Sequence, residues 1–237
     1  MKYSKTKGLV MIGSLRSAGL TTYMRQGKVV TRVSQSDERR SNTLAQFRQR
    51  QRMRHTLALW TTLRQCEPTF TQRATAYTNF MSLANRLPVV YVVRPLMEQA
   101  SFLMPGLPVS DGVLPSIGQE LAVVDGTAAL VTSMRAGDAD TGAELWLYCG
   151  EQRDEGPAPR VWFSKRRVSW LELSLVEGRY VLKDEVFADD MRGWALVMVK
   201  GGRCSSQGLV TRCRLYERFT TEEALRASAE SYGGLTE

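Results

Sequence analysis

The sequence is poor in the residues on which most catalytic chemistry depends. The chain of 237 residues has one histidine, His55, and four cysteines, Cys66, Cys149, Cys204 and Cys213. A site with several histidine ligands is therefore excluded, and a Ser-His-Asp triad would have to use His55. No two cysteines form a CxxC pair, so their spacing indicates neither a disulfide framework nor a zinc site. We expect the four cysteines to be buried structural thiols.

Long apolar runs are also missing. The longest candidates, residues 88–93 and 194–199, are far shorter than the roughly 20 residues that cross a bilayer. The apolar run near the start, residues 8–15, is short and broken by glycines, and no small-residue cleavage site follows it, which argues against a secretory signal. We expect no membrane partner and a cytoplasmic location, or a place in a virion if a phage encodes the chain.

Positive charge is abundant but confined to the first part of the chain. The formal net charge is +8. Residues 1–66 hold 14 Lys and Arg and only two acids, a net charge of +12, so the rest of the chain carries −4. Such a block is typical of an arm that contacts nucleic acid, membrane headgroups or an acidic protein. The residues expected to make these contacts are Arg16, Arg25, Lys28, Arg32, Arg39, Arg40, Arg48, Arg50, Arg52 and Arg54.

Residues 1–42 are predicted to form a basic, glycine-containing arm with a β-hairpin. Two β-favourable runs, 21–25 and 28–33, are separated by Gln26 and Gly27, and glycine readily takes the positive φ that a two-residue turn needs. A polar link follows the hairpin.

Residues 43–87 are predicted to form a helical hairpin. Thr43 and Gln46 fit a capping box, and no Gly or Pro follows until after about Leu63. A second helix is predicted over 71–86, packed on the first. The apolar side of the first helix is expected at Leu44, Phe47, Met53, Leu57, Trp60 and Leu63.

The arginines of the first helix do not share one face. At about 100° per residue, Arg48 and Arg52 share one stripe, and Arg50 and Arg54 lie roughly opposite. His55 is expected to be partly solvated beside this run. It lies about 16 Å along the helix from Cys66, too far for a hydrogen-bonded nucleophile pair within that helix.

From residue 88 the hydrophobic period changes to two, which predicts an antiparallel β-sandwich or barrel over 88–219. Leu145 and Leu147, and also Leu171, Leu173 and Leu175, are expected to face the core. The expected strands are 89–93, 113–117, 121–124, 128–134, 144–149, 160–163, 170–176, 179–186, 194–200 and 209–217.

Turns and the C-terminal segment complete an α+β fold. Two-residue hairpin turns are expected at residues 177–178 and 201–202. Residues 220–237 are predicted to form a short helix and tail, with Thr221 as the helix cap and Gly233 as its stop.

Several short motifs give the chain a resemblance to a known family. They are GSLRSAG at 13–19, YMRQGK at 23–28, SNTLAQ at 41–46 followed by Arg50, VSDGVL at 109–114 and CSSQ at 204–207. With these motifs the chain resembles an uncharacterised family of Bacteroidota proteins, the domain-of-unknown-function family numbered 6266. Its N-terminal pattern is also similar to small proteins of prophages and other mobile elements. The resemblance implies no reaction, cofactor or catalytic residue.

Two loops match known binding loops only in part. Residues 138–142, DADTG, lack the third acid, the glycine and the closing glutamate of a calcium loop, so a solvated turn is expected. Residues 201–208 are glycine-rich but lack the Lys-Ser/Thr ending and the following helix of a P-loop, so a hairpin is expected. We expect no catalytic residue, no cofactor and no metal.

These patterns favour a non-enzymatic structural or assembly protein, encoded by a phage or mobile element, whose basic arm makes subunit or partner contacts. The expected partners are further copies of the chain or a larger protein assembly. Nucleic-acid binding through the Lys/Arg block is the alternative, although no helix-turn-helix, RNA-recognition or zinc-finger pattern accompanies it. A third possibility is an enzyme whose site the fold assembles from scattered residues.

Overall fold

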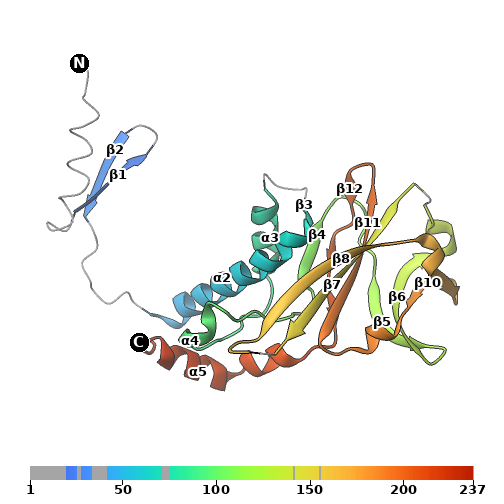
Figure 1. The fold of residues 1–237 in the computed structure, drawn as a ribbon. Coiled ribbons are helices and arrows are strands. Elements are labelled where there is room, and N and C mark those ends of the chain that lie inside the picture. Colours follow the sequence, from blue (N-terminus) through green and yellow to red (C-terminus); the bar gives the residue numbers. More distant parts are fainter. Residues whose placement is uncertain are drawn as a thin grey trace, which may run out of the picture. The chain divides into compact units, whose positions relative to one another are not determined.

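The computed structural model describes residues 20–25, 28–33, 42–70, 75–140, 142–154 and 156–236. The chain divides into two compact units, Met1–Asn42 and Thr43–Glu237, which are described separately (Figure 1). The α+β prediction is confirmed, because helices and antiparallel strands both build the second unit. In the ranges described, no helix is long and apolar enough to cross a membrane.

The first unit contains a β-hairpin where the sequence predicts one. β1 (Leu20–Arg25) and β2 (Lys28–Val33) form an antiparallel ladder whose last pair is Arg25 with Lys28. The predicted turn at 26–27 lies outside the described residues. No third described strand joins this ladder, so it is a sheet of two strands.

The first helix has the predicted bounds but a different buried side. α2 (Leu44–Leu63) is capped by Thr43, whose Oγ1 accepts the N–H of Gln46 at 3.4 Å. Leu44, Met53 and Leu57 are 38%, 40% and 50% exposed, so the predicted apolar stripe is wrong at these positions. The stripe that faces the protein repeats every four residues and consists of Phe47, Gln51, His55, Leu59 and Leu63.

The second helix is shorter than predicted. α3 (Ala76–Ala84) begins after Thr75, which has extended backbone angles and caps the helix, so a start at residue 71 is wrong. Residues 71–74 themselves lie outside the described ranges. α3 packs on α2, with the rings of Trp60 and Phe80 5.3 Å apart.

The strands of the second unit form three sheets. A five-stranded sheet has the order β12-β11-β7-β8 with β14 paired to β11, a four-stranded sheet has the order β5-β6-β10-β9, and a small sheet has the order β13-β4-β3. Only β3 and β4 pair in parallel among these strands. Their bounds are β3 (Thr69–Phe70), β4 (Pro108–Asp111), β5 (Gln119–Val124), β6 (Thr127–Arg135), β7 (Glu144–Arg153), β8 (Arg160–Val168), β9 (Leu173–Val176), β10 (Arg179–Lys183), β11 (Arg192–Lys200), β12 (Arg203–Cys204), β13 (Gln207–Gly208) and β14 (Val210–Thr211).

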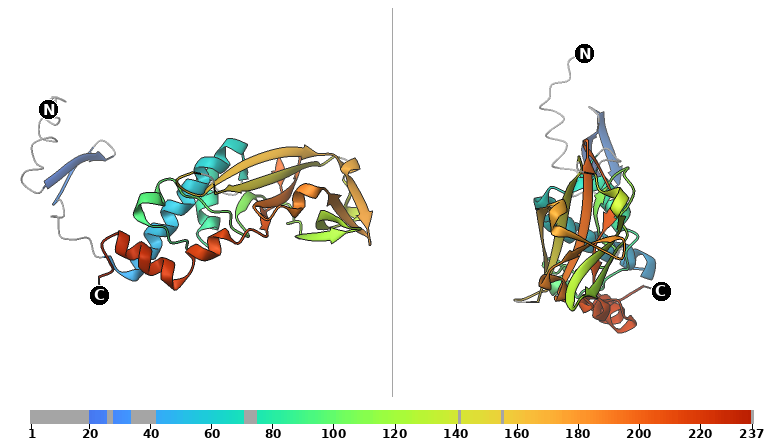
Figure 2. Two further views of the ribbon diagram at one scale, coloured as in Figure 1. Left: turned by 60° about the horizontal axis from the view of Figure 1, so that its bottom comes forward. Right: turned by 90° about the vertical axis from the view of Figure 1, so that its right-hand side faces the viewer.

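The five-stranded sheet is buried on both faces. Alternate residues of β11 belong to different cores: Leu196 packs toward the four-stranded sheet and Ala195 toward the helices. Leu145 and Leu147 of β7 are buried in the core between the two sheets, as predicted. Figure 2 shows the helices gathered at one end of this unit and the four-stranded sheet at the other.

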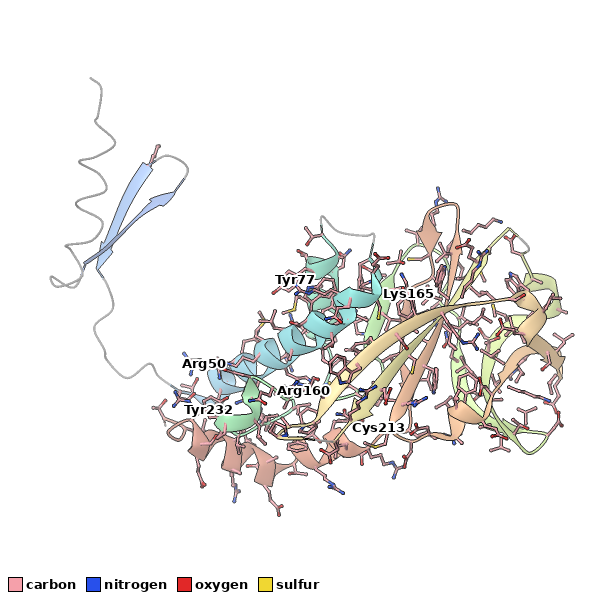
Figure 3. All side chains as sticks on the ribbon, in the orientation of Figure 1. Arg50, Tyr77, Arg160, Lys165, Cys213 and Tyr232 are labelled. Carbon is pink, nitrogen blue, oxygen red and sulfur yellow. The ribbon has the colours of Figure 1, made fainter. Side chains whose placement is uncertain are left out.

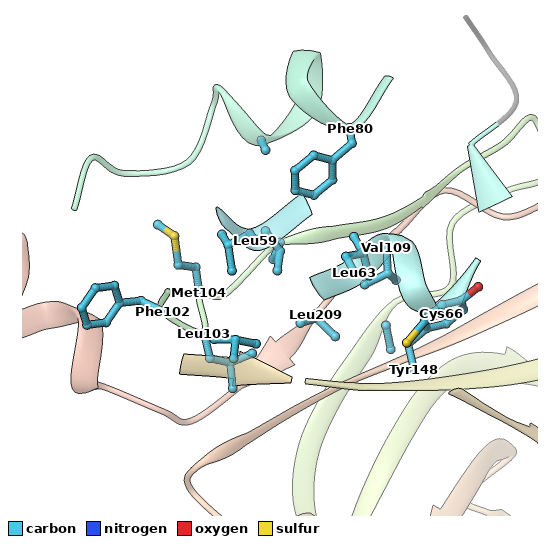
Figure 4. Close-up of a cluster of buried hydrophobic side chains, with 14 of the residues drawn as sticks. Leu59, Leu63, Cys66, Phe80, Phe102, Leu103, Met104, Val109, Tyr148 and Leu209 are labelled. Atoms are coloured by element: carbon cyan, nitrogen blue, oxygen red, sulfur yellow. The ribbon is translucent and has the colours of Figure 1, made fainter. Parts of the chain in front are cut away.

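The larger core lies between the helices and the five-stranded sheet (Figure 4). Leu59 of α2, Phe80 of α3 and Tyr148 of β7 are each exposed by 2% or less. Gly150 of β7 lies against the side chain of Leu103, and a Cβ added to it would be 2.7 Å from Leu103 Cδ1. A side chain at this position would therefore force Leu103 to move.

The predicted strand at 89–93 is wrong. The segment joins no described sheet, because its backbone groups bond elsewhere. The N–H of Tyr91 donates to the carbonyl oxygen of Phe219 at 2.7 Å, and the carbonyl oxygen of Val92 accepts from Ser228 Oγ at 2.9 Å. A single helical turn that the sequence did not predict, α4 (Arg94–Met97), follows this segment.

Four other predicted strands are wrong in whole or in part. The strand predicted at 179–186 ends with β10 at Lys183, because Glu185–Ala188 is a 3-10 turn. Residues 113–117 contribute only an isolated bridge. Residues 209–217 contain only the two-residue β14 before a 3-10 turn. Trp170–Glu172 is a 3-10 turn rather than the start of β9, so Leu171 is 96% exposed. Leu175, on the edge strand β9, is 51% exposed, and of the three predicted core leucines here only Leu173 is buried.

The predicted turns and the C-terminal helix are confirmed. Glu177 and Gly178 have φ values of 50° and 78°, as a two-residue hairpin turn requires. Gly201 and Gly202 likewise have positive φ between β11 and β12. α5 (Glu222–Ser231) begins after its cap Thr221 and is followed by Gly233 with φ 96°.

Candidate functional site: a basic helix and the groove beside it

The predicted contact residues fall into three groups. Some lie outside the described residues: Arg16, Arg39 and Arg40. Others lie on the β1–β2 ladder: Arg25, Lys28 and Arg32. The rest lie on α2 of the second unit: Arg48, Arg50, Arg52 and Arg54.

The register of the β1–β2 ladder places its three basic residues at positions of the same face. Arg25 is directly opposite Lys28, and Arg32 follows Lys28 by four residues on the same strand. Lys28 is exposed.

The arginines of α2 have different surroundings. Arg48, Arg50 and Arg54 are exposed, whereas Arg52 is half-buried, with a buried Nε that has no hydrogen-bond partner in the described chain. The first turn of α2 contains no acidic residue. Because Arg52 is half-buried, the four arginines do not form a single exposed face.

Arg54 lines a groove between α2, α4 and the end of α5. The groove has a volume of about 460 Å³, and its lining includes Leu57, Arg94, Met97 and Tyr232. The guanidinium carbon of Arg54 lies 5.2 Å from the centre of the Tyr232 ring, a cation–π arrangement. Figure 3 shows Tyr232 where α5 ends, beside α2.

Hydrogen bonds from two serines of α5 hold the walls of this groove together. The buried Ser228 accepts from Gln51 Nε2 at 3.2 Å and donates to the carbonyl oxygen of Val92. Ser231 Oγ accepts the backbone N–H of Arg94 at 3.1 Å. These bonds fix α5 to α2 and to the segment that carries α4.

His55 is buried rather than partly solvated, so that prediction is wrong. It is 4% exposed, its ring lies 5.6 Å from that of Phe102, and neither ring nitrogen has a hydrogen-bond partner among the residues described. Burial lowers the pKa of His55 to about 4, which makes the ring neutral at pH 7. The signal in the sequence for the burial of His55 was its position in the series of residues spaced by four from Phe47 to Leu63.

The four cysteines are free thiols. Cys66, Cys204 and Cys213 are buried, as predicted, and Cys149 is half-buried. Burial raises the pKa of Cys149 to about 11 and also raises the pKa of Cys66 and Cys213. A thiol with a raised pKa is a poor nucleophile at pH 7, because the thiolate is the reactive form.

The two loops that partly match binding motifs, residues 138–142 and 201–208, make contacts that hold their own turns. Asp138 accepts the N–H of Arg135 at 2.7 Å, and Asp140 accepts the N–H of Gly142 and pairs with Lys200. The glycines at 201–202 form the β11–β12 hairpin turn. Within the described ranges, no group of three or more His, Cys, Asp or Glu could hold a metal ion.

Comparisons with known proteins add no relative. No family model, no curated protein and no solved structure matches the chain. The family resemblance of the short motifs stays a prediction, and the function has to be inferred from the arrangement of the residues.

Proposed function

We propose that the protein is a non-enzymatic assembly protein whose basic N-terminal arm binds a second copy of the chain. The β1–β2 ladder carries the proposal, because it is a sheet of two strands in a unit of its own. A two-stranded hairpin alone is marginally stable in water and needs a third strand or a packed surface. Strand edges that pair with nothing in the described chain can pair with a strand of another chain.

Most of the net charge lies in the arm rather than in the body, which is residues 43–237. Residues 1–42 hold nine Lys and Arg and two acids, a net charge of +7, and the body carries +1. Contact of the arm with acidic side chains of another copy would orient the association of the two chains. A head-to-tail contact of this kind builds rings or filaments.

Two further observations support the proposal. The motifs similar to those of mobile-element proteins favour a phage or mobile element as the source. The single histidine is buried and neutral, and burial raises the pKa of Cys66, Cys149 and Cys213, so none of these four residues is an activated nucleophile or base.

Light scattering of the full chain and of a chain that starts at Thr43 tests the proposal. We expect the full chain to be larger than a monomer, with a size that depends on concentration and salt, and the shortened chain to be monomeric. Both chains are expected to melt cooperatively at similar temperatures, which controls for misfolding. A monomeric full chain, or an oligomer that survives deletion of the arm, would reject the proposal.

Nucleic-acid binding is the second candidate. The exposed Arg48, Arg50 and Arg54 favour it, because guanidinium groups neutralise phosphates and release counterions. Titration of DNA and RNA at several salt concentrations tests it, since affinity should fall steeply with log salt. No binding at low salt, about 50 mM, would reject this candidate.

A further inference from the structure

The groove beside α2 has the volume of a small-molecule site, and the proposed assembly gives it no role. Its volume of about 460 Å³ lies within the usual range of ligand pockets, roughly 300–1,000 Å³. Two cations, Arg54 from α2 and Arg94 from α4, and one acid, Glu98, line it. Neither arginine takes part in an ion pair with another described residue.

α5 contacts both arginines, Arg54 at its guanidinium and Arg94 at its backbone. The ring of Tyr232 lies under the Arg54 guanidinium at 5.2 Å. The backbone of Arg94 is tied to Ser231 by a hydrogen bond of 3.1 Å. A guanidinium that is already positioned, as that of Arg54 is, loses less conformational entropy when a ligand binds.

The groove also has an apolar part. Leu57 of α2, which is 50% exposed, and Met97 of α4, which is 4% exposed, both line it. A half-exposed leucine next to two arginines without an ion pair in the described chain suits a ligand with an anionic head and an apolar body.

We propose that this groove binds a small phosphate monoester with an aromatic or aliphatic body. The guanidinium groups of Arg54 and Arg94 bind the phosphate oxygens, and Leu57 and Met97 contact the apolar body. Planar guanidinium groups match phosphate oxygens in pairs. With Glu98 in the lining, the formal charge of the groove is +1, which favours one anionic group on the ligand over two.

NMR of the full chain with ¹³C-labelled methionine methyl groups tests this proposal at the site itself. The Met97 methyl signal, assigned with a Met97→Leu variant, is followed while phenyl phosphate is added. We expect a saturable shift of Met97 and none of Met134, which lies in the core between the two sheets. Inorganic phosphate, which lacks the apolar body, and benzyl alcohol, which lacks the charge, should each bind at least about fivefold more weakly.

Matched arginine variants separate the groove from the general basic charge of the chain. Arg54→Ala and Arg94→Ala should each weaken the binding of phenyl phosphate at least about fivefold. Arg54→Lys should weaken it less than Arg54→Ala, because lysine keeps the charge but lacks the paired N–H donors of a guanidinium. Arg203→Ala removes an exposed arginine of β12, outside the groove, and should change affinity less than about twofold. Thermal melting checks that each variant is folded.

Three results would overturn the proposal. One is no saturable Met97 shift with phenyl phosphate, and another is equal weakening by Arg203→Ala and the groove variants. The third is that benzyl alcohol or benzoate binds as tightly as phenyl phosphate, which would remove the role of the phosphate group. None of these results depends on whether the arm mediates assembly.

Discussion

The hairpins β1–β2 and β9–β10 have a similar local design but different support. Both are antiparallel ladders joined by two residues, and Glu177-Gly178 supplies the positive φ values of the β9–β10 turn. β10 also pairs with β6, and Leu173 and Leu182 enter the core between the sheets. β1–β2 pairs with no other described strand. Turn chemistry makes a hairpin, but neighbouring strands and a core make it stable, so we infer that the arm relies on another chain.

If the body is stable without the arm, a substitution that disrupts its packing should destabilise it whether or not the arm binds another chain. The largest effect is expected from Gly112→Ala, because an added Cβ would overlap the backbone carbonyl of Cys204. We expect the free energy of unfolding to fall by about 3 kcal/mol or more, measured by urea denaturation. Gly137→Ala, where no atom lies within 4 Å of the added Cβ, is the control and should change it by less than about 0.5 kcal/mol. Equal effects of the two variants would contradict the packing described here.

Acid should destabilise the body through His55. Its pKa is about 4 in the folded chain and near 6.5 when exposed, so below pH 6.5 the unfolded chain binds a proton that the folded chain does not. The free energy of unfolding should therefore fall by about 3 kcal/mol as the pH decreases from 6.5 to 4. Urea denaturation of His55→Leu at several pH values should lack this component. An unchanged pH dependence in that variant would show that another group is responsible.

A smaller effect is expected where α5 is attached to the body. Ser228→Ala removes the partners of Gln51 Nε2 and of the Val92 carbonyl, which are both buried. The expected loss is about 1–3 kcal/mol in the free energy of unfolding. Tyr232→Phe is the contrast, because the Tyr232 hydroxyl is buried without a partner in the described chain, and its removal should cost less than about 0.5 kcal/mol. Calorimetry of both variants checks the order.

The smallest effect on the body is expected from a change in the arm. Thr31→Pro removes a backbone N–H from β2, where Thr31 pairs with Thr22. Because the ladder belongs to the other unit, the free energy of unfolding of the body should change by less than about 0.5 kcal/mol. Assembly, followed by light scattering, should weaken at least about tenfold. A loss of body stability with assembly intact would reverse the division of roles between the units.

The sequence was most informative where local chemistry alone decides the structure. The turns at 177–178 and 201–202 and the caps Thr43 and Thr221 were predictable, because each depends on residues within one turn of the chain. The long central strands β7 and β11 were predictable from their apolar runs.

The sequence was least informative where distant residues decide. Residues 89–93 have a β-favourable composition, but Phe219 and Ser228 bond to their backbone. The buried side of α2 was mispredicted because Gln51 and His55 are polar. The groove brings together Arg54, Arg94 and Tyr232, and no local pattern links residues so far apart.

Hydrogen exchange on the β1–β2 ladder tests most directly whether the arm relies on a second chain. The amides of 20–25 and 28–33 would be followed over about a hundredfold range of protein concentration, with those of β7 and β11 as an internal reference. We expect the protection of the ladder to fall on dilution while that of β7 and β11 stays constant. Protection of the ladder that does not change with concentration would contradict the proposed assembly.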